Sequence, residues 1–435
     1  MFSISDIQHP HRAELHNEVH ARPPEALSGS LSITHVVMLA DASQRAKSRA
    51  HLADLLHDHH LPIPDQRTTH LRVDIASLRL RWEVHTEFVA WTFTTHEAQA
   101  REGGTPASAL RAVPQDWLRE IPGQCLCSLD LWVLPQHGDL GDHRIREMLN
   151  EQTLVGAAVA GEQARVFTDF AIHPDGSSRM LLFAGDLHPR RLGRLVQRLL
   201  EIETYRMVAL LGLPAARQAS EILGSAESEL ADLAHAIRSA DRDAEPALLD
   251  RLTRLAGQVE SQHAATHSRL SASRAYFELL DQRIAQISES RLDGLQSIAE
   301  FMDRRLTPAR KTCEWAERRQ NALSQRVSRV SNLLRTRVEI EQQQSSQALL
   351  QALNRRQDLQ LKLQATVEGL SVAAITYYIV GLVSYLAKGA QKIGWPWSPE
   401  STAAMAIPFV ALSIWWSLRR LHRKMFVHRD VQAGG

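Results

Sequence analysis

The residues best suited to chemistry are the histidines, because more than half of the 21 in the chain lie before residue 100. His16 and His20 are four residues apart, so a helix would carry both imidazoles on one face. Glu14 or Glu18 adds a carboxylate beside them, and imidazole and carboxylate groups are common metal ligands. His16, His20 and Glu18 are therefore candidate ligands for a divalent metal ion, with a histidine-rich soluble surface as the alternative.

Two of the three cysteines are close enough in sequence to act together. Cys125 and Cys127 would lie on the same side of a strand, either as a metal or redox pair or as two small core residues. Three cysteines are too few for a disulfide framework, which favours a reducing cytoplasm. The P-loop, GxGxxG, HExxH and GxSxG patterns are absent, so we expect no enzyme activity.

A third set of candidate residues lies in and beside a long uncharged run near the other end of the chain. Small and polar residues recur there in steps of three and four, which places them on one side of a helix. They are Glu368, Ser371, Ala374, Tyr378, Gly381, Tyr385 and Lys388. A face of this kind favours protein or water over lipid, so it either lines an ion path in an oligomer or packs helices together.

The uncharged run itself, 369–387, approaches the ~30 Å thickness of a bilayer core. A second uncharged run, 402–418, follows it, and Pro408 would kink that helix without ending it. Trp395 and Trp397 lie in the connector, as is typical of a membrane surface. Basic residues are in excess outside the connector on both sides, which predicts a transmembrane hairpin with both termini in the cytoplasm.

Long helices are indicated for the middle of the chain, where glycine and proline are rare. Pro246 and Pro308 suit the first turn of a helix, so we expect breaks there and three long helices in all. Apolar residues from Phe277 to Met302 recur in steps of three and four and predict one stripe on the second helix. The third helix is expected to run unbroken from Pro308 into the membrane.

An α/β domain is indicated before residue 188, because stretches that fit strands alternate with helical segments near 42–56 and 142–150. The expected strands cover residues 31–39, 71–82, 88–93, 126–134, 154–160, 166–172 and 180–183. The fold class is thus an α+β and α-helical membrane protein. Its expected parts are a cytoplasmic α/β domain (1–187), a long-helix coiled-coil region (188–365), a first transmembrane helix (366–387), an outer connector (388–401), a second transmembrane helix (402–418) and a basic cytoplasmic tail (419–435).

Charge restricts the partners. Lys plus Arg total 50 against 49 Asp plus Glu, so the chain has no basic field that would favour nucleic acid. Residues 1–12 do not build the apolar core of a signal peptide, so we expect the N-terminus to stay in the cytoplasm. The expected partners are the lipid bilayer and further copies of the same chain.

Two resemblances extend these predictions. The segments HPHRAELHNEVHARPPEAL (9–27) and TVEGLSVAAITYYIVGLVSYLAKG (366–389) resemble a bacterial family of uncharacterised, predicted membrane-anchored proteins with a domain of unknown function. That resemblance implies a multi-pass protein of the bacterial inner membrane. The order of the elements is also similar to the CorA-type magnesium transporters, in which the first span lines a pentameric pore. Their Gly-Met-Asn motif is absent here, where the span ends in Ala387, Lys388 and Gly389, so magnesium selectivity is not implied.

The sequence therefore leaves two functions open. The first is an oligomeric CorA-like ion channel or transporter with a cytoplasmic regulatory domain. The second is a membrane-tethered coiled-coil scaffold or sensor without transport activity. A metal-dependent enzyme built on His16, His20 and Glu18 ranks below both, because the sequence indicates neither a nucleophile nor a general base beside them.

Overall fold

The computed structural model describes residues 7–12, 15–16, 23–96, 106–135, 138–239, 244–391, 394 and 396–427. Its internal contacts divide the chain into two units, Met1–Asn332 and Leu333–Gly435. The first unit holds a sheet domain and a group of long helices. The second holds the remainder of one of those helices and a further helix.

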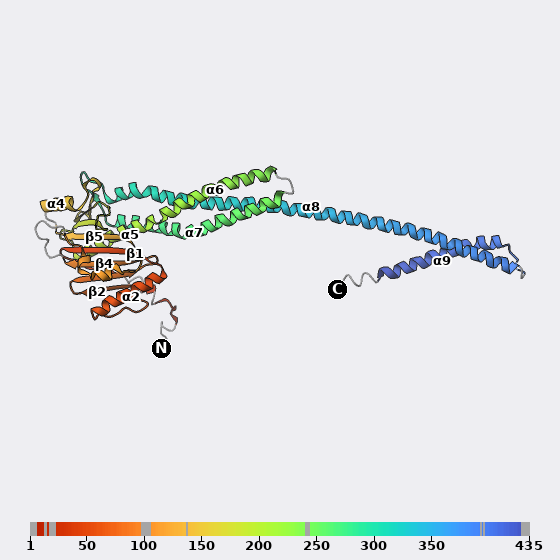
Figure 1. Cartoon of the computed structure of the whole chain (residues 1–435), viewed down its shortest axis with the longest axis horizontal. Coiled ribbons are helices and arrows are strands. Elements are labelled where there is room, and N and C mark those ends of the chain that lie inside the picture. Colours follow the sequence, from red (N-terminus) through yellow and green to blue (C-terminus); the bar gives the residue numbers. More distant parts are fainter. Residues whose placement is uncertain are drawn as a thin grey trace. The chain divides into compact units, whose positions relative to one another are not determined.

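In the described part of the first unit, nine strands form one mixed sheet (Figure 1). Its order is β2-β3-β4-β1-β5-β8-β7-β6-β9, and the β5–β8 pair is parallel whereas the other pairs are antiparallel. The predicted N-terminal domain of strands and helices is thereby confirmed. The strands are β1 (Leu31–Leu39), β2 (His70–Ile75), β3 (Leu78–Val84), β4 (Phe88–His96), β5 (Gln124–Leu134), β6 (Val155–Val159), β7 (Ala164–Thr168), β8 (Ser178–Phe183) and β9 (Ser290–Arg291).

One expected strand is two separate strands in the structure. The run 71–82 was predicted as a single strand, but β2 and β3 pair as a hairpin across Ala76 and Ser77. Ala76 has a φ of 53°, in the left-handed region that reverses the chain. Asp74 accepts a 2.5 Å hydrogen bond from Arg79 Nε, which ties the two strands together beside the turn. Apolar alternation continues through both strands, so periodicity alone did not reveal the turn.

Helices cover both faces of the sheet. α2 (Ala42–Asp58) lies on one face, where Leu52, Trp82 and Trp91 are fully buried. α4 (Gly138–Met148) covers the β5, β8 and β7 part of the same face. α5 (Pro189–Leu210) crosses the opposite face and completes the largest apolar core. Short helical elements complete the domain at η2 (Ala109–Ala112), α3 (Gln115–Arg119) and η3 (Glu151–Thr153).

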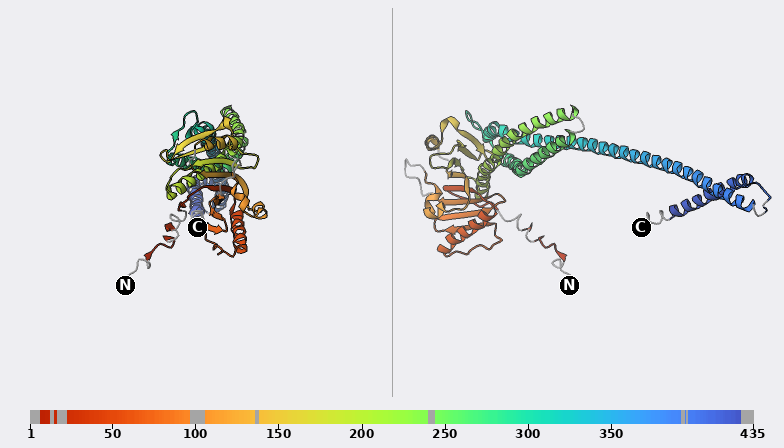
Figure 2. Two further views of the ribbon diagram at one scale, coloured as in Figure 1. Left: turned by 90° about the vertical axis from the view of Figure 1, so that its left-hand side faces the viewer. Right: turned by 45° about the vertical axis from the view of Figure 1, so that its right-hand side comes forward.

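A three-helix bundle follows the sheet domain (Figure 2). It consists of α6 (Gly212–Ser239), α7 (Glu245–Gln286) and the part of α8 (Ile298–Gln391) that belongs to the first unit. Ala216 of α6, Leu270 of α7, and Cys313 and Ala316 of α8 pack together in its core. Arg319 Nη2 lies 2.6 Å from Glu227 Oε2, so an ion pair joins α8 to α6.

The expected helix boundaries are wrong at three places. The first expected long helix is two helices, because α5 ends at Leu210 and α6 begins at Gly212. The stripe from Phe277 to Met302 is shared by α7 and α8, because the chain leaves the helix after Gln286 and starts a new one at Ile298. Glu289 fixes this break, since its carboxylate accepts hydrogen bonds from the N–H groups of Ile298 (3.1 Å) and Ala299 (2.9 Å). Pro308 instead lies inside α8, where its ring removes a single backbone hydrogen bond near the start of a very long helix.

In the second unit, α8 continues to Gln391 and α9 runs from Pro399 to Val427. The expectation of an unbroken helix to residue 387 is confirmed. Among the helices of the described ranges, α8 is the one that is long and apolar enough to cross a membrane by length and composition, and 6% of its apolar window is buried. The second predicted span, 402–418, lies within α9. Its pairing with α8 as a membrane hairpin stays a prediction.

Candidate functional site

Of the predicted metal ligands, the structure describes His16, which is exposed. Glu18 and His20 lie outside the described residues, so this metal cluster stays a prediction. Within the ranges that the structure does describe, no group of three or more His, Cys, Asp or Glu side chains is arranged to hold a metal ion. Burial raises the pKa of Cys125 and of Cys127, so neither thiol is an activated thiolate at neutral pH.

Part of the predicted stripe on α8 lines a cavity. Tyr378, Gly381 and Tyr385 line a volume of about 740 Å³ between α8 and α9, together with Ala403 and Ile407 of α9. The remaining stripe residues do not line that cavity; they are Glu368, Ser371, Ala374 and Lys388. The tyrosine side chains are 75% and 76% exposed at Tyr378 and Tyr385, so this chain by itself leaves the stripe largely uncovered.

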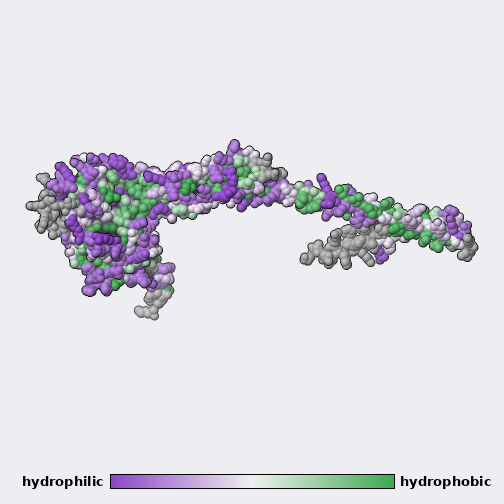
Figure 3. Space-filling model, in the orientation of Figure 1, coloured by the Kyte–Doolittle hydropathy of each residue, from purple (hydrophilic) through white to green (hydrophobic). Residues whose placement is uncertain are grey.

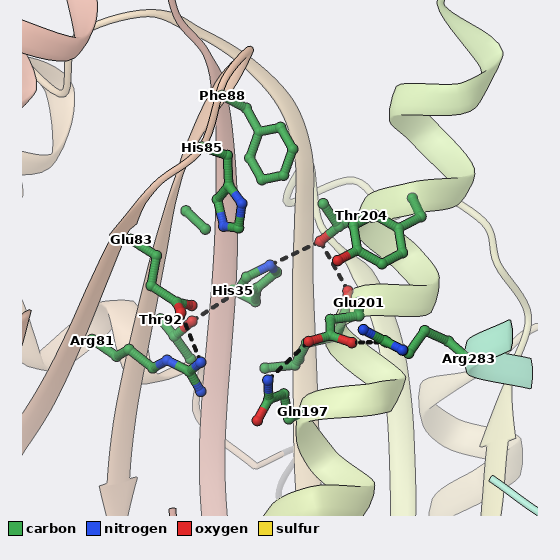
Figure 4. A pocket seen from close by; sticks show the side chains of 13 residues that line it. His35, Arg81, Glu83, His85, Phe88, Thr92, Gln197, Glu201, Thr204 and Arg283 are labelled. Atoms are coloured by element: carbon green, nitrogen blue, oxygen red, sulfur yellow. Dashed lines mark hydrogen bonds and ion pairs between the residues drawn. The ribbon is translucent and has the colours of Figure 1, made fainter. Parts of the chain in front are cut away.

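A more polar and better enclosed site lies in the first unit, between the sheet and α5 (Figure 4). We call it the sheet–helix pocket, and its volume is about 230 Å³. The sheet contributes His35 from β1, Arg81 and Glu83 from β3, His85 from the β3–β4 turn, and Phe88, Ala90 and Thr92 from β4. The helices contribute Gln197, Leu200, Glu201, Thr204 and Tyr205 from α5 and Arg283 from α7.

Strand alternation explains why charged groups gather at this pocket. Leu80 and Trp82 point toward α2 and are buried there, so Arg81 and Glu83 must point to the opposite face. That face is covered by α5, on which Gln197, Glu201 and Thr204 recur in steps of four and three and so share one side. The polar sides of a strand and a helix therefore meet, and a pocket remains where they do.

His35 is the most buried titratable group in the pocket, with 5% of its surface exposed. Its Nδ1 lies 2.8 Å from Thr92 Oγ1 and its Nε2 lies 3.0 Å from Thr204 Oγ1. The Thr204 hydroxyl donates to the Leu200 carbonyl at 2.9 Å, so it accepts from His35 and the imidazole proton resides on Nε2. Burial lowers the pKa of His35 to about 4, which keeps the ring neutral at physiological pH.

Two ion pairs border the neutral imidazole. Arg81 Nη2 donates to Glu83 Oε1 at 2.8 Å on the strand side. Burial is the largest single influence on Glu83 and opposes its ionisation. The charge and the hydrogen bond of Arg81, with smaller effects of the neighbouring histidines, together outweigh burial and lower the pKa of that carboxyl below its ordinary value. On the helix side, Arg283 pairs with Glu201. Each carboxylate of the pocket therefore lies beside one guanidinium.

One polar atom in the pocket is unsatisfied. Gln197 donates from Nε2 to Glu201 Oε1 at 2.8 Å, but its own Oε1 is buried and accepts no hydrogen bond. A buried acceptor without a donor is costly, and in native proteins it is unusual. Because both nitrogens of His35 are already bonded to threonines, the pocket presents binding groups rather than a general base beside a nucleophile.

Sequence reasoning did not single out these residues. His35 was one histidine among many before residue 100, and Arg81 and Glu83 looked like the solvent-facing side of a strand. Arg283 is far from them in sequence and reaches the pocket through the packing of α7. The available signal was the polar spacing of Gln197, Glu201 and Thr204 on a helix whose leucines and isoleucine belong to the largest apolar core.

The fold and the site together define a mixed-sheet domain with a polar pocket, followed by long helices of which one carries an exposed apolar segment. The chain belongs to the family described as "Protein of unknown function (DUF3422)", whose model matches residues 7–425. No curated protein and no solved structure matches the chain. The match covers the sheet domain, the bundle and both helices of the second unit, so these parts form one family architecture.

Proposed function

We propose that this protein is a membrane protein that assembles through α8 into an oligomer and passes ions along the polar stripe of that helix. The sheet domain is its cytoplasmic regulatory part. The observation that carries the proposal is the exposure of Tyr378 and Tyr385 on a segment whose other side chains, such as Leu370 and Leu382, are also exposed and apolar. Apolar side chains suit lipid, whereas polar side chains at the same depth need protein or water.

The surface of α8 before its apolar segment supports assembly. Leu323 and Val327 are buried within the three-helix bundle. Leu349, Leu353 and Leu363 continue the same face of the helix in the second unit, where they are exposed, and green patches mark the apolar residues of this helix in Figure 3. Further copies of the chain would cover this face as helices cover one another in a coiled coil. The order of the elements is the one that suggested the CorA-type resemblance.

Ion passage is testable in proteoliposomes that hold the purified full-length protein. We expect flux of K⁺, Na⁺ or Mg²⁺, read with ion-sensitive dyes, and at least a several-fold decrease when Tyr378→Ala removes a polar group from the stripe. Tyr377→Ala is the matched control, because Tyr377 is 77% exposed and Tyr378 is 75% exposed, yet Tyr377 lies off the stripe. An intact oligomer without flux for any of the three ions contradicts the proposal.

A membrane-tethered sensor or scaffold without transport is the second candidate, and the sheet–helix pocket favours it. A pocket with paired charges and an unsatisfied acceptor offers a ligand a binding site whether or not ions move. The two candidates differ in the detergent-extracted particle. Monomers or dimers whose spans enclose no path support the sensor, whereas a closed ring of subunits supports the channel.

A further inference from the structure

The sheet–helix pocket has balanced charge. Its lining residues include two carboxylates, Glu83 and Glu201, and two guanidiniums, Arg81 and Arg283, while His35 is neutral. A ligand with a net charge would add an unbalanced charge to a partly enclosed site, where water screens charges less well than in bulk. A ligand that carries one positive and one negative group preserves the balance.

The hydrogen-bond acceptor and the hydrogen-bond donors that a ligand would use lie on different sides of the pocket. On the helix side, Gln197 Oε1 accepts no hydrogen bond, while Nε2 of the same amide donates to Glu201. This side therefore needs a hydrogen-bond donor. On the strand side, Arg81 donates to Glu83 through Nη2, and a guanidinium has further N–H groups that fit a carboxylate. Figure 4 shows these two sides facing each other across His35.

The size of the pocket restricts the ligand further. About 230 Å³ is below the ~300–1,000 Å³ typical of drug-sized ligands, so the occupant has few heavy atoms. Phe88 and Leu200 add an apolar wall, which suits a short aliphatic side chain. We propose that the pocket binds a small zwitterion of the amino acid type, with its ammonium group at Glu201 and Gln197 Oε1 and its carboxylate at Arg81.

The inference goes beyond ion passage and does not rest on it, because binding is measured without flux. Isothermal titration of the full-length protein in detergent compares valine with isobutylamine, which lacks the carboxylate, and with isovalerate, which lacks the ammonium. We expect valine to bind at least tenfold more tightly than either analogue. Alanine, ethylamine and propionate form a second set of the same design for a smaller side chain.

The variant Gln197→Leu tests the mode of binding. It removes the unsatisfied acceptor and also the 2.8 Å hydrogen bond that Nε2 donates to Glu201, which Arg283 still pairs with. We therefore expect a small change in the unfolding temperature of the unliganded protein, while zwitterion affinity falls at least tenfold. Gln258→Leu is the control, since Gln258 is exposed on α7. If an amine or an acid binds as tightly as the matched zwitterion, if neither zwitterion binds, or if Gln197→Leu binds as well as the unmodified protein, the proposal is wrong.

Discussion

The surroundings of His35 keep its ring neutral and also determine which ring nitrogen carries the proton. Thr92 and Thr204 occupy both ring nitrogens, and the ring is buried between the sheet and α5. Burial lowers its pKa to about 4 from an ordinary value of 6.5, with Arg81 and His85 acting in the same direction and Glu83 opposing them. The folded protein therefore resists taking up a proton that the unfolded chain accepts readily.

This difference predicts how stability depends on pH. Between pH 6.5 and about 4 the unfolded chain binds a proton at His35 that the folded chain does not, so stability falls as the pH is lowered through that range. The total loss is about 3 kcal/mol, because each pKa unit corresponds to ~1.4 kcal/mol. Above pH 6.5 the ring is neutral in both states, so it does not make stability depend on pH there.

Urea unfolding followed by tryptophan fluorescence across this pH range measures the effect. We expect the variant His35→Gln, which keeps a donor and an acceptor, to lose much of the slope between pH 6.5 and 4. His57→Gln should keep the slope of the unmodified protein, because the His57 side chain is 80% exposed. An unchanged slope in His35→Gln would show that other groups control the acid response.

The sequence predicted the first strand of this site but not the site. The bounds of β1 were read correctly as 31–39, since a long alternating apolar run has few other solutions. The neighbours of His35 could not be read, because they depend on which face of the sheet α5 covers and on the strand order, which are long-range properties. Arg81 and Glu83 have the pattern of a solvated strand face and become pocket residues only through that packing.

The packing of α5 against the segment 23–28 depends on the absence of a side chain. A Cβ at Gly193 would lie 1.5 Å from the backbone oxygen of Glu25. The segment is held in place by Leu27 N, which donates to the Pro189 carbonyl at 3.0 Å, and by the ion pair of Glu25 with Arg79. Glycine at this position is therefore a requirement of close approach between backbone and helix.

Replacing this glycine gives a prediction with an internal control. Gly193→Ala should destabilise the protein by about 1–3 kcal/mol or more, because the backbone at Glu25 must move away. Gly257→Ala in α7 should stabilise it by roughly 0.5–1 kcal/mol, because nothing lies within 4 Å of the added Cβ and alanine favours a helix. Urea denaturation compares the two, and equal effects would contradict the contact at Glu25.

The break between α7 and α8 shows where helical periodicity misleads. Phe277, Ile287, Ile298 and Met302 all belong to one apolar core, so their spacing correctly identified buried residues. The spacing did not show that the residues belong to two helices. Two consecutive helices that pack into the same core can together have the apolar spacing of a single helix. The pair Asp293–Gly294 was the local turn signal, and Gly294 has a φ of 77°.

The oligomer that we propose would assemble through the exposed face of α8. Leu349, Leu353 and Leu363 lie on that face, whereas Leu350 and Leu361 are equally exposed but point away from it. We expect the triple variant with glutamine at the first three positions to lower the particle mass in detergent, as measured by light scattering. The double variant Leu350→Gln, Leu361→Gln should leave the mass unchanged, and an equal effect of both variants would exclude this face as the interface.

The position of β9 has a consequence for biosynthesis. The sheet is completed by Ser290 and Arg291, which pair with Ala157 and Ala158 after the chain has passed through α5, α6 and α7. Roughly 75 residues separate Arg291 from the first predicted span at 366, which at ~5–20 residues per second corresponds to several seconds of translation. The last strand thus leaves the ribosome before the apolar segment does, and the pocket can close before any step that delivers the nascent chain to a membrane.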